Sequence, residues 1–235
     1  MAASTQRKED IFDMAIRLLD AECGTGITDI VVPVQTKGSE SPNGVAKGYP
    51  NLEVLNQEVL SCQRCALYKG RTHAVPGEGS PRAKLMFIGE GPGAEEDRTG
   101  RPFVGRAGQL LDRMIAAMGL SREQVYIANV VKCRPPNNRV PAPEEIISCL
   151  PYLWSQIDLI QPEVLCLLGR TATTGVLKED LPLRQTRGRW FEVRGRRARV
   201  SFHPAYLLRN PEQKREAWED LKSVMAELGL SVPQK

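Results

Sequence analysis

The spacing of apolar and polar positions along the chain predicts strands that alternate with helices. Continuous apolar runs that end in glycine or a polar residue predict buried strands at 83–89, 125–131 and 164–168. Apolar residues three and four positions apart predict helices, and two short segments separated by Arg-Gly-Arg predict a hairpin. The predicted helices cover 52–59, 107–118, 143–160 and about 212–228, and the predicted hairpin strands cover 190–193 and 197–202.

This alternation indicates an α/β fold with a parallel sheet. Strands that are apolar on both sides need helices on both faces of the sheet to remove them from water. In such folds ligands bind beyond the carboxyl ends of the strands. Candidate functional residues are therefore those that follow each predicted strand.

The first 50 residues differ in character from the rest. Apart from a short amphipathic stretch at 11–19, they are rich in Gly, Pro, Ser and other small polar residues, which is typical of a linker or tail. We expect a flexible N-terminal extension at 1–50 and a single folded domain at 51–235. No internal repeat is visible.

Composition narrows the picture only slightly. The 235 residues carry a net charge of +4 with a pI near 8.8, which suits a polyanionic partner without identifying one. No run of about 18 apolar residues and no secretory signal is visible, so we expect a cytoplasmic protein, inside a bacterial or archaeal cell and without a membrane partner. The chain gives no sign of association, and we expect a monomer.

Four of the six cysteines have a spacing that suggests a metal site. Cys62 and Cys65 form a C-x-x-C pair, and Cys133 and Cys149 flank a proline-rich loop. Four thiolates can hold either a [4Fe–4S] cluster or a structural zinc ion, and spacing alone does not separate these from four unrelated cysteines. Cys166 lies within an apolar strand, which indicates an ordinary core residue.

A glycine-rich segment follows the first predicted strand. Glu90 stands at the strand's carboxyl end, where a general base could meet a substrate, and Gly91 and Gly93 allow close approach of main-chain N–H groups to a flat ligand. We predict a loop, not a helix, from Glu90 through Phe103. A glycine-rich surface loop with solvated acids is the alternative, because the spacing is not that of a dinucleotide-binding motif.

Two further polar residues stand at strand ends. Asn129 lies in an otherwise apolar run, where a buried amide needs hydrogen-bond partners, which could also be neighbouring backbone. His203 opens the segment His-Pro-Ala-Tyr-Leu-Leu-Arg-Asn-Pro at the end of the last predicted strand.

Together these motifs resemble family 4 of the uracil-DNA glycosylase superfamily, the iron–sulfur branch. The resemblance covers about residues 52–230 and rests on G-E-G-P-G, E-E-D-x-T-G-R-P-F-V-G-x-A-G-Q, the strand asparagine before V-K-C-R-P-P, and H-P-A-Y-L-L-R-N-P, all in order. It implies a three-layer α/β/α sandwich with a central, mainly parallel sheet. It also implies a [4Fe–4S] cluster on the four spaced cysteines and a pocket for uracil flipped out of DNA.

The resemblance further implies the role of each site residue. Glu90 and His203 would be catalytic, Phe103 would stack on the base and Asn129 would read its edge. Such an enzyme hydrolyses the bond between uracil and the sugar in base excision repair, leaves an abasic site and does not cut the strand. The expected substrate-binding residues are Gly91, Pro92, Gly93, Glu96, Asp97, Phe103, Asn129 and His203.

Basic residues flank these motifs as a phosphate-binding rim would require. Arg209 is the strongest candidate for DNA contact, because it follows the histidine motif; Arg101, Arg106, Arg134 and Arg139 are others. Two alternatives are a relative that cross-links to DNA and an inactive iron–sulfur module that binds DNA. The cross-linking branch uses a histidine-containing loop, and residues 134–148 contain no histidine.

Overall fold

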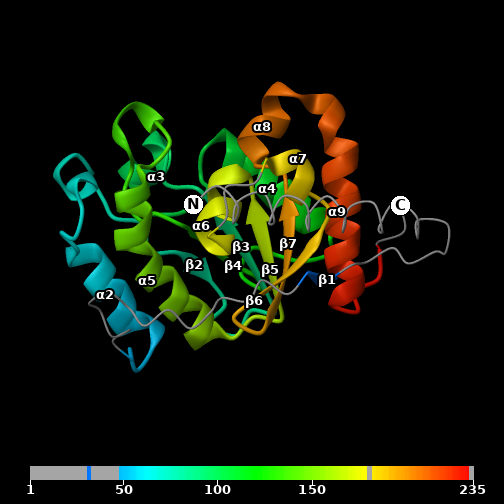
Figure 1. Cartoon of the computed structure of the whole chain (residues 1–235), viewed down its shortest axis with the longest axis horizontal. Coiled ribbons are helices and arrows are strands. Elements are labelled where there is room, and N and C mark those ends of the chain that lie inside the picture. Colours follow the sequence, from blue (N-terminus) through cyan, green and yellow to red (C-terminus); the bar gives the residue numbers. More distant parts are fainter. Residues whose placement is uncertain (1–30, 33–47, 179–181, 233–235) are drawn as a thin grey trace, which may run out of the picture. The chain divides into compact units, whose positions relative to one another are not determined.

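The computed structural model of the chain describes residues 31–32, 48–178 and 182–232. Contacts divide the chain into two units, Met1–Ile30 and Val31–Lys235, and every described residue belongs to the second. A seven-stranded sheet forms the centre of this unit (Figure 1). The strands, in spatial order, are β1 (Val31–Val32), β6 (Trp190–Val193), β7 (Arg196–Ser201), β5 (Val164–Leu168), β3 (Leu85–Gly89), β4 (Tyr126–Asn129) and β2 (Glu78–Gly79).

The middle of the sheet is parallel and its borders are mixed. Strands β7, β5, β3 and β4 all run in the same direction, whereas β2 pairs antiparallel with β4, and β6 pairs antiparallel with β7. The carboxyl ends of the four parallel strands therefore meet at one edge of the sheet. The predicted catalytic residues Glu90 and His203, and Asn129, lie at that edge.

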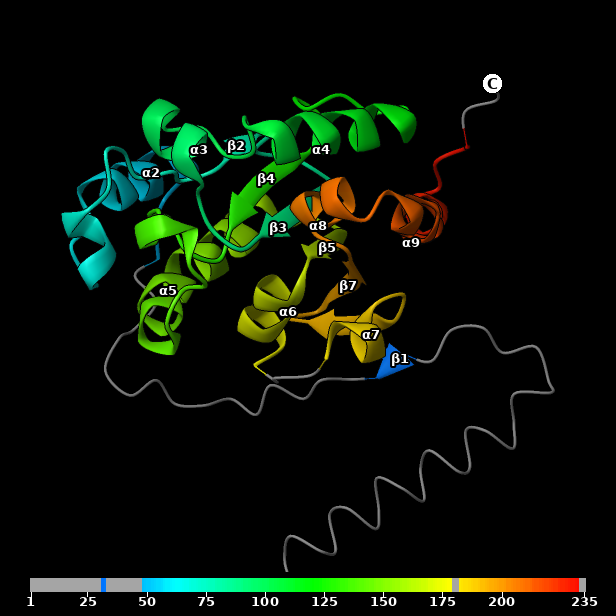
Figure 2. The same cartoon turned by 90° about the horizontal axis from the view of Figure 1, so that it is seen from above.

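Helices cover both faces of the sheet, so the predicted three-layer α/β/α sandwich is confirmed (Figure 2). Helices α4 and α9 pack on one face, and α2, α5 and α6 pack on the other. The helices are α2 (Leu52–Ser61), α3 (Ala94–Thr99), α4 (Arg106–Ala117), α5 (Pro143–Ile160), α6 (Arg170–Leu177), α7 (Leu183–Thr186), α8 (Pro204–Arg209) and α9 (Lys214–Glu227).

Successive side chains along each strand point to opposite faces of the sheet, and they form one hydrophobic core on each face. In β3, Leu85 and Phe87 face α4 and α9, while Met86 and Ile88 face α2, α5 and α6. All five residues of the strand are buried, which explains why its sequence is apolar at every position. A sheet covered on both faces leaves its strand ends as the place for polar chemistry.

One prediction in the glycine-rich segment is wrong. The segment after Gly93 is not a continuous loop, because Ala94–Thr99 forms α3. The physical reason lies in its acidic first turn: the carboxylate of Glu96 accepts a hydrogen bond from the N–H of Gly93 at 3.1 Å, which satisfies a free donor at the helix start. Nearby glycines obscured this short helix in the sequence.

The other differences concern short elements and boundaries. Strand β4 is shorter than predicted, and the last helix begins at Lys214 after a separate 3₁₀ turn at Pro211–Gln213. Helices α3, α6, α7 and α8 and strands β1 and β2 were not predicted. None of the helices in the described part of the chain combines the length and apolar character needed to span a bilayer.

Most of the predicted N-terminal extension lies outside the described residues. Val31 and Val32 are an exception, because they form β1 and pair in parallel with Trp190 and Phe191 of β6. The division into an extension at 1–50 and a domain at 51–235 stays a prediction.

Candidate active site

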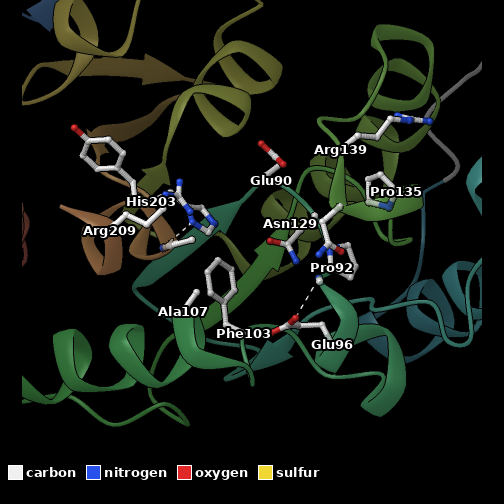
Figure 3. Close-up of a pocket in the computed structure, with 15 residues that line it drawn as sticks. Glu90, Pro92, Glu96, Phe103, Ala107, Asn129, Pro135, Arg139, His203 and Arg209 are labelled. Carbon is white, nitrogen blue, oxygen red and sulfur yellow. Dashed lines mark hydrogen bonds between the residues drawn. The ribbon is translucent and has the colours of Figure 1, made fainter. Parts of the chain in front are cut away.

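A cavity of about 450 Å³ opens at the carboxyl edge of the sheet (Figure 3). Its walls come from the ends of β3 and β4, from α3 and from α8 with the residues just before it. The lining residues are Glu90, Gly91, Pro92, Gly93, Glu96, Phe103, Ala107, Asn129, Pro135, Asn138, Arg139, His203, Ala205, Tyr206 and Arg209. All predicted substrate-binding residues except Asp97 are among them.

Asn129 presents an unused acceptor to this cavity. Its side chain is 1% exposed, and its Oδ1 atom has no hydrogen-bond partner among the described residues. A buried polar atom without a partner costs free energy, and Oδ1 of Asn129 is therefore placed to accept a hydrogen bond from a group that enters the cavity. Strand pairing fixes its position, because Asn129 is in register with Gly89 of β3.

Gly89 makes room for the two side chains that meet in the cavity. A Cβ atom on Gly89 would lie 2.5 Å from Oδ1 of Asn129 and 2.5 Å from Cζ of Phe103, both closer than real side-chain contacts. The glycine at the end of β3 is therefore a steric requirement of the site rather than only a flexible turn.

Phe103 supplies a flat apolar wall. Its side chain is 5% exposed, and its ring centroid lies 5.6 Å from that of His203 with the rings inclined by 31°. The backbone at Phe103 has φ 51°, an uncommon value for a residue with a bulky side chain. Such a conformation persists only when surrounding contacts hold it, and it is typical of functional sites.

A network of charged residues holds this backbone. The guanidinium of Arg122 donates to the carbonyls of Pro102 and Phe103, the latter at 3.3 Å, and to the carboxylate of Glu78 at 2.8 Å. Arg101 forms a second pair with Glu78, and hydrogen bonding with Arg101 and Arg122 lowers the pKa of that carboxyl to about 2. The loop that carries Phe103 is thus anchored to β2 by charge.

His203 presents a neutral imidazole to the cavity. Its Nδ1 atom accepts a hydrogen bond from the N–H of Ala205 at 3.1 Å, which leaves the proton of the neutral ring on Nε2. Burial, together with the nearby charge of Arg209, lowers the pKa of His203 to about 4. Pro204, the first residue of α8, fixes the helix start that orients the ring.

Glu90 stands at the end of β3 with its carboxylate turned away from the Asn129 amide (Figure 3). The hydroxyl of Thr171, in the first turn of α6, donates a hydrogen bond to Oε2 of Glu90. The N–H of Val131 donates to the Glu90 carbonyl at 3.1 Å, which fixes the backbone. The acid is therefore held from two directions.

The two acids of α3 have different surroundings. Glu96 lines the cavity, but its carboxylate accepts three backbone hydrogen bonds, from Gly93, Val104 and Gly105, at 2.8–3.1 Å. Asp97 is buried outside the cavity lining, and its Oδ1 accepts from the N–H of Thr72 at 2.9 Å. The carboxylate of Asp97 is thus turned toward Thr72 and does not line the cavity, and its expected contact with the substrate stays a prediction.

The cavity has a basic rim. Arg209 and Arg139 line it, and Arg139 is also paired with Glu145 at 2.7 Å. Arg209 forms no ion pair within the described part of the chain. The side chain of Arg101 forms an ion pair with Glu78, and that of Arg134 donates a hydrogen bond to Asn138. Both cations therefore already have partners within the protein. Figure 3 shows Arg139 and Arg209 on opposite sides of the cavity.

The four spaced cysteines line a second, smaller cavity between α2 and α5. Cys62, Cys65, Cys133 and Cys149 all contribute to its wall. Within the described residues, no three His, Cys, Asp or Glu side chains come close enough together to hold one metal ion. Cys166 is part of the core next to α9, as expected.

Several hydrogen-bond donors point at the sulfur atoms. The guanidinium of Arg71 lies 3.1 Å from Sγ of Cys133, and the N–H of Lys132 lies 3.2 Å from Sγ of Cys149. Burial raises the pKa of the Cys149 thiol to about 12 and raises that of Cys133, so a metal must replace these protons to bind.

Sequence reasoning missed some residues of the site. Tyr206 and Asn138 line the main cavity, and Thr171 and Arg122 act on its residues from other elements. A signal existed for Tyr206, which lies within the histidine motif. None existed for Thr171 or Arg122, because their partners are 81 and 19 residues away in the chain.

Comparison with known proteins identifies the family to which the chain belongs. The profile of the family described as "Uracil DNA glycosylase superfamily" matches residues 76–222. Among similar proteins, the type-4 uracil-DNA glycosylase of Sulfurisphaera tokodaii is 45% identical over 74% of this chain and 83% of its own length.

Two further relatives carry the same name. The type-4 uracil-DNA glycosylase of Thermotoga maritima is 45% identical over 73% of this chain and 91% of its own length. The type-4 uracil-DNA glycosylase of Archaeoglobus fulgidus is 41% identical over 78% of this chain and 96% of its own. The resemblance to family 4 is confirmed, and the chain belongs to the uracil-DNA glycosylase superfamily.

Proposed function

We propose that this protein is a uracil-DNA glycosylase, which takes uracil out of DNA and hydrolyses its bond to the sugar as the first step of base excision repair. The observation that carries the proposal is the unpartnered Oδ1 of Asn129, buried in a cavity beside an aromatic ring. A base inside a duplex cannot be reached, so the enzyme must extrude the nucleotide into such a pocket.

The cavity matches the chemistry of uracil. The N3–H of uracil donates to Oδ1 of Asn129, and the O4 atom accepts from the amide Nδ2 of the same side chain. Phe103 covers one face of the ring by stacking. Arg209 and Arg139 stand where phosphates of the bent strand would pass, which supports a role in gripping the backbone.

Cleavage of the bond to the sugar depends on groups near O2 and N1 of uracil. As the bond between C1′ of the sugar and N1 of uracil breaks, its electron pair moves to the base and negative charge develops on O2. The Nε2–H of neutral His203 donates to O2 and stabilises that charge. A donor that is already oriented and desolvated needs no reorganisation as the charge appears.

Glu90 is the acid that serves the sugar side. Its carboxylate is turned away from the Asn129 amide (Figure 3), whereas both carboxylate oxygens of Glu96 accept hydrogen bonds from backbone N–H groups. A water held by the Glu90 carboxylate adds its oxygen to C1′ and gives its proton to that carboxylate. The uracil anion then takes up one proton from solvent and Glu90 releases its proton to solvent, so the products are free uracil and an abasic site.

The site lacks the nucleophile that strand cleavage would need. Enzymes that cut the strand form a Schiff base through an amine, and none of the described residues lining the cavity is a lysine. Lys132 is buried, and its Nζ donates to the carbonyl of Asn129 at 2.8 Å and to Oε1 of Gln156 at 2.7 Å. Hydrolysis by water is therefore the reaction the site supports.

We further propose that Cys62, Cys65, Cys133 and Cys149 hold a [4Fe–4S] cluster. Four thiols around one cavity match its ligand set, and each binds a different iron atom, so the sulfurs need not converge on a single point as zinc would require. The hydrogen bonds to two of the sulfurs favour anionic ligands. The cluster would join α2, α5 and the 133–142 loop, and its role is structural.

An oligonucleotide with one uracil tests the proposed reaction against its alternatives. After incubation and treatment with alkali, a glycosylase gives a cleaved strand, because an abasic site is alkali-labile. A covalent adduct that survives denaturation would identify the cross-linking branch instead. An intact, unmodified strand would leave only a DNA-binding module. We expect cleavage with alkali and none without it.

A further inference from the structure

We propose that Thr171 is a positioning residue for the reaction, which acts by holding the carboxylate of Glu90. The inference rests on the proposed glycosylase function. Thr171 is the second residue of α6 and lies two positions after Gly169, the glycine that follows β5. Its hydroxyl donates to Oε2 of Glu90, at the end of the neighbouring strand β3.

The hydroxyl of Thr171 is not needed by its own helix. The start of α6 is formed without any side-chain cap, and Gly169 is the residue at the cap position. Two other threonines in the same helix show the contrast. The hydroxyl of Thr173 donates to the carbonyl of Gly169 at 2.9 Å, whereas the buried hydroxyl of Thr174 has no partner among the described residues. Only Thr171 points its hydroxyl at an active-site acid.

Such a bond has a clear mechanical effect. A glutamate side chain has three rotatable bonds, and a carboxylate at the mouth of a cavity would otherwise sample several rotamers. Fixing Oε2 leaves Oε1 free to hold the water and sets the direction from which it approaches C1′. Orientation of this kind raises the rate of the chemical step rather than the affinity for DNA.

The turn before α6 contacts the other proposed catalytic residue, His203, as well. A Cβ atom on Gly169, whose φ is +87°, would lie 2.9 Å from Cβ of His203, so the turn before α6 packs closely against that side chain. The segment Gly169–Thr171 thus adjoins both His203 and Glu90. The hydroxyl of Thr171 can be removed without disturbing this packing. Substitution by valine does so, because valine has nearly the same shape as threonine.

The test is single-turnover excision of uracil at saturating DNA, with DNA affinity measured separately. For Thr171→Val we expect the rate to fall about tenfold to a hundredfold, as for loss of a hydrogen bond to a charged group, with unchanged DNA affinity. Thr171→Ser keeps the donor and should retain most of the rate. Thr174→Val, the matched control in the same helix, should behave like the wild type.

A double-mutant cycle decides whether Thr171 acts through Glu90. In a Glu90→Ala background, Thr171→Val should cost nothing more, because the acceptor is already gone. Independent, multiplying losses would overturn the proposal, and so would a wild-type rate in Thr171→Val alone. If a thermal melt shows that Thr171→Val is not folded, Thr171→Ala takes its place in the same cycle. An inactive wild-type protein would instead refute the proposed function.

Discussion

At the scale of single residues, we propose that Asn129 decides which base the site accepts. Its amide can face the N3–H donor and the O4 acceptor of uracil together. Cytosine inverts the pattern, with an unprotonated N3 and an amino group at C4, so both contacts would become repulsive or unpaired. A site built for hydrogen bonding can reject such a mismatch by about 10⁴-fold or more. Asn129 could be predicted as a candidate from the sequence, because it is a polar residue in an otherwise apolar strand.

Asn129→Asp should exchange this preference. The carboxylate repels O4 of uracil but accepts from the amino group of cytosine, so we expect uracil excision to fall about a hundredfold or more, with a weak gain of cytosine excision. Single-turnover assays on both substrates measure the change. Asn51→Asp is a control for the added charge, because Asn51 caps α2 away from the cavity and aspartate caps equally well. Wild-type excision of uracil by Asn129→Asp would remove it from base reading.

His203 should make the protein sensitive to acid. Its pKa is lowered from 6.5 to about 4 by burial, so between these pH values the unfolded chain binds a proton that the folded protein does not. Stability then falls as the pH is lowered through this window, by up to about 1.4 kcal/mol per pH unit from this group. Melting temperatures between pH 7 and pH 4 should fall more steeply for the wild type than for His203→Gln. Parallel curves would show that His203 is not desolvated.

At the scale of elements, the long helices and buried strands could be predicted because each has its own periodic pattern. The 143–160 helix and the 164–168 strand have the predicted bounds. Helix α3 could not be predicted from such a pattern. Glycines flank its six residues on both sides, and its start is held by the hydrogen bond that the N–H of Gly93 donates to the carboxylate of Glu96. Likewise, spacing alone cannot show that Glu96 faces the cavity and Asp97 the opposite side.

The end of β3 gives a test of how elements form the site. Gly89→Ala should reduce uracil excision about a hundredfold or more, because the new Cβ would occupy the space between Asn129 and Phe103. Gly70→Ala is the matched control, since a Cβ there meets nothing within 4 Å. Comparison of excision rates, with melting temperatures to confirm folding, checks this. Equal activity of the two variants would contradict the steric account.

At the scale of the whole molecule, we propose that the two cavities have separate tasks. The cysteines lie between α2 and α5, whereas the catalytic residues lie at the carboxyl edge of the sheet. Lys132 stands between them, because its backbone N–H points to Cys149 and its side chain holds the carbonyl of Asn129. Loss of the proposed cluster would therefore disturb the position of Asn129 in β4 through Lys132. This effect is structural and involves no redox chemistry.

Removal of one cysteine ligand should cost stability before chemistry. We expect the purified protein to be brown, with iron and acid-labile sulfide, and Cys133→Ser to lose both and to melt at a lower temperature. Cys166→Ala, a buried cysteine outside the cluster cavity, should keep full iron and sulfide. Zinc in stoichiometric amount without sulfide in the wild type would exclude the cluster.

The central claim is that the cavity at the sheet edge releases uracil from DNA by hydrolysis. The most direct measurement quantifies free uracil and alkali-labile sites after a single turnover on a uracil-containing oligonucleotide. We predict one free uracil for each abasic site in the wild type, no strand break before alkali, and a rate lowered by at least about a hundredfold in His203→Ala. Strand cleavage without alkali, a stable covalent adduct, or abasic sites without free uracil would contradict this account.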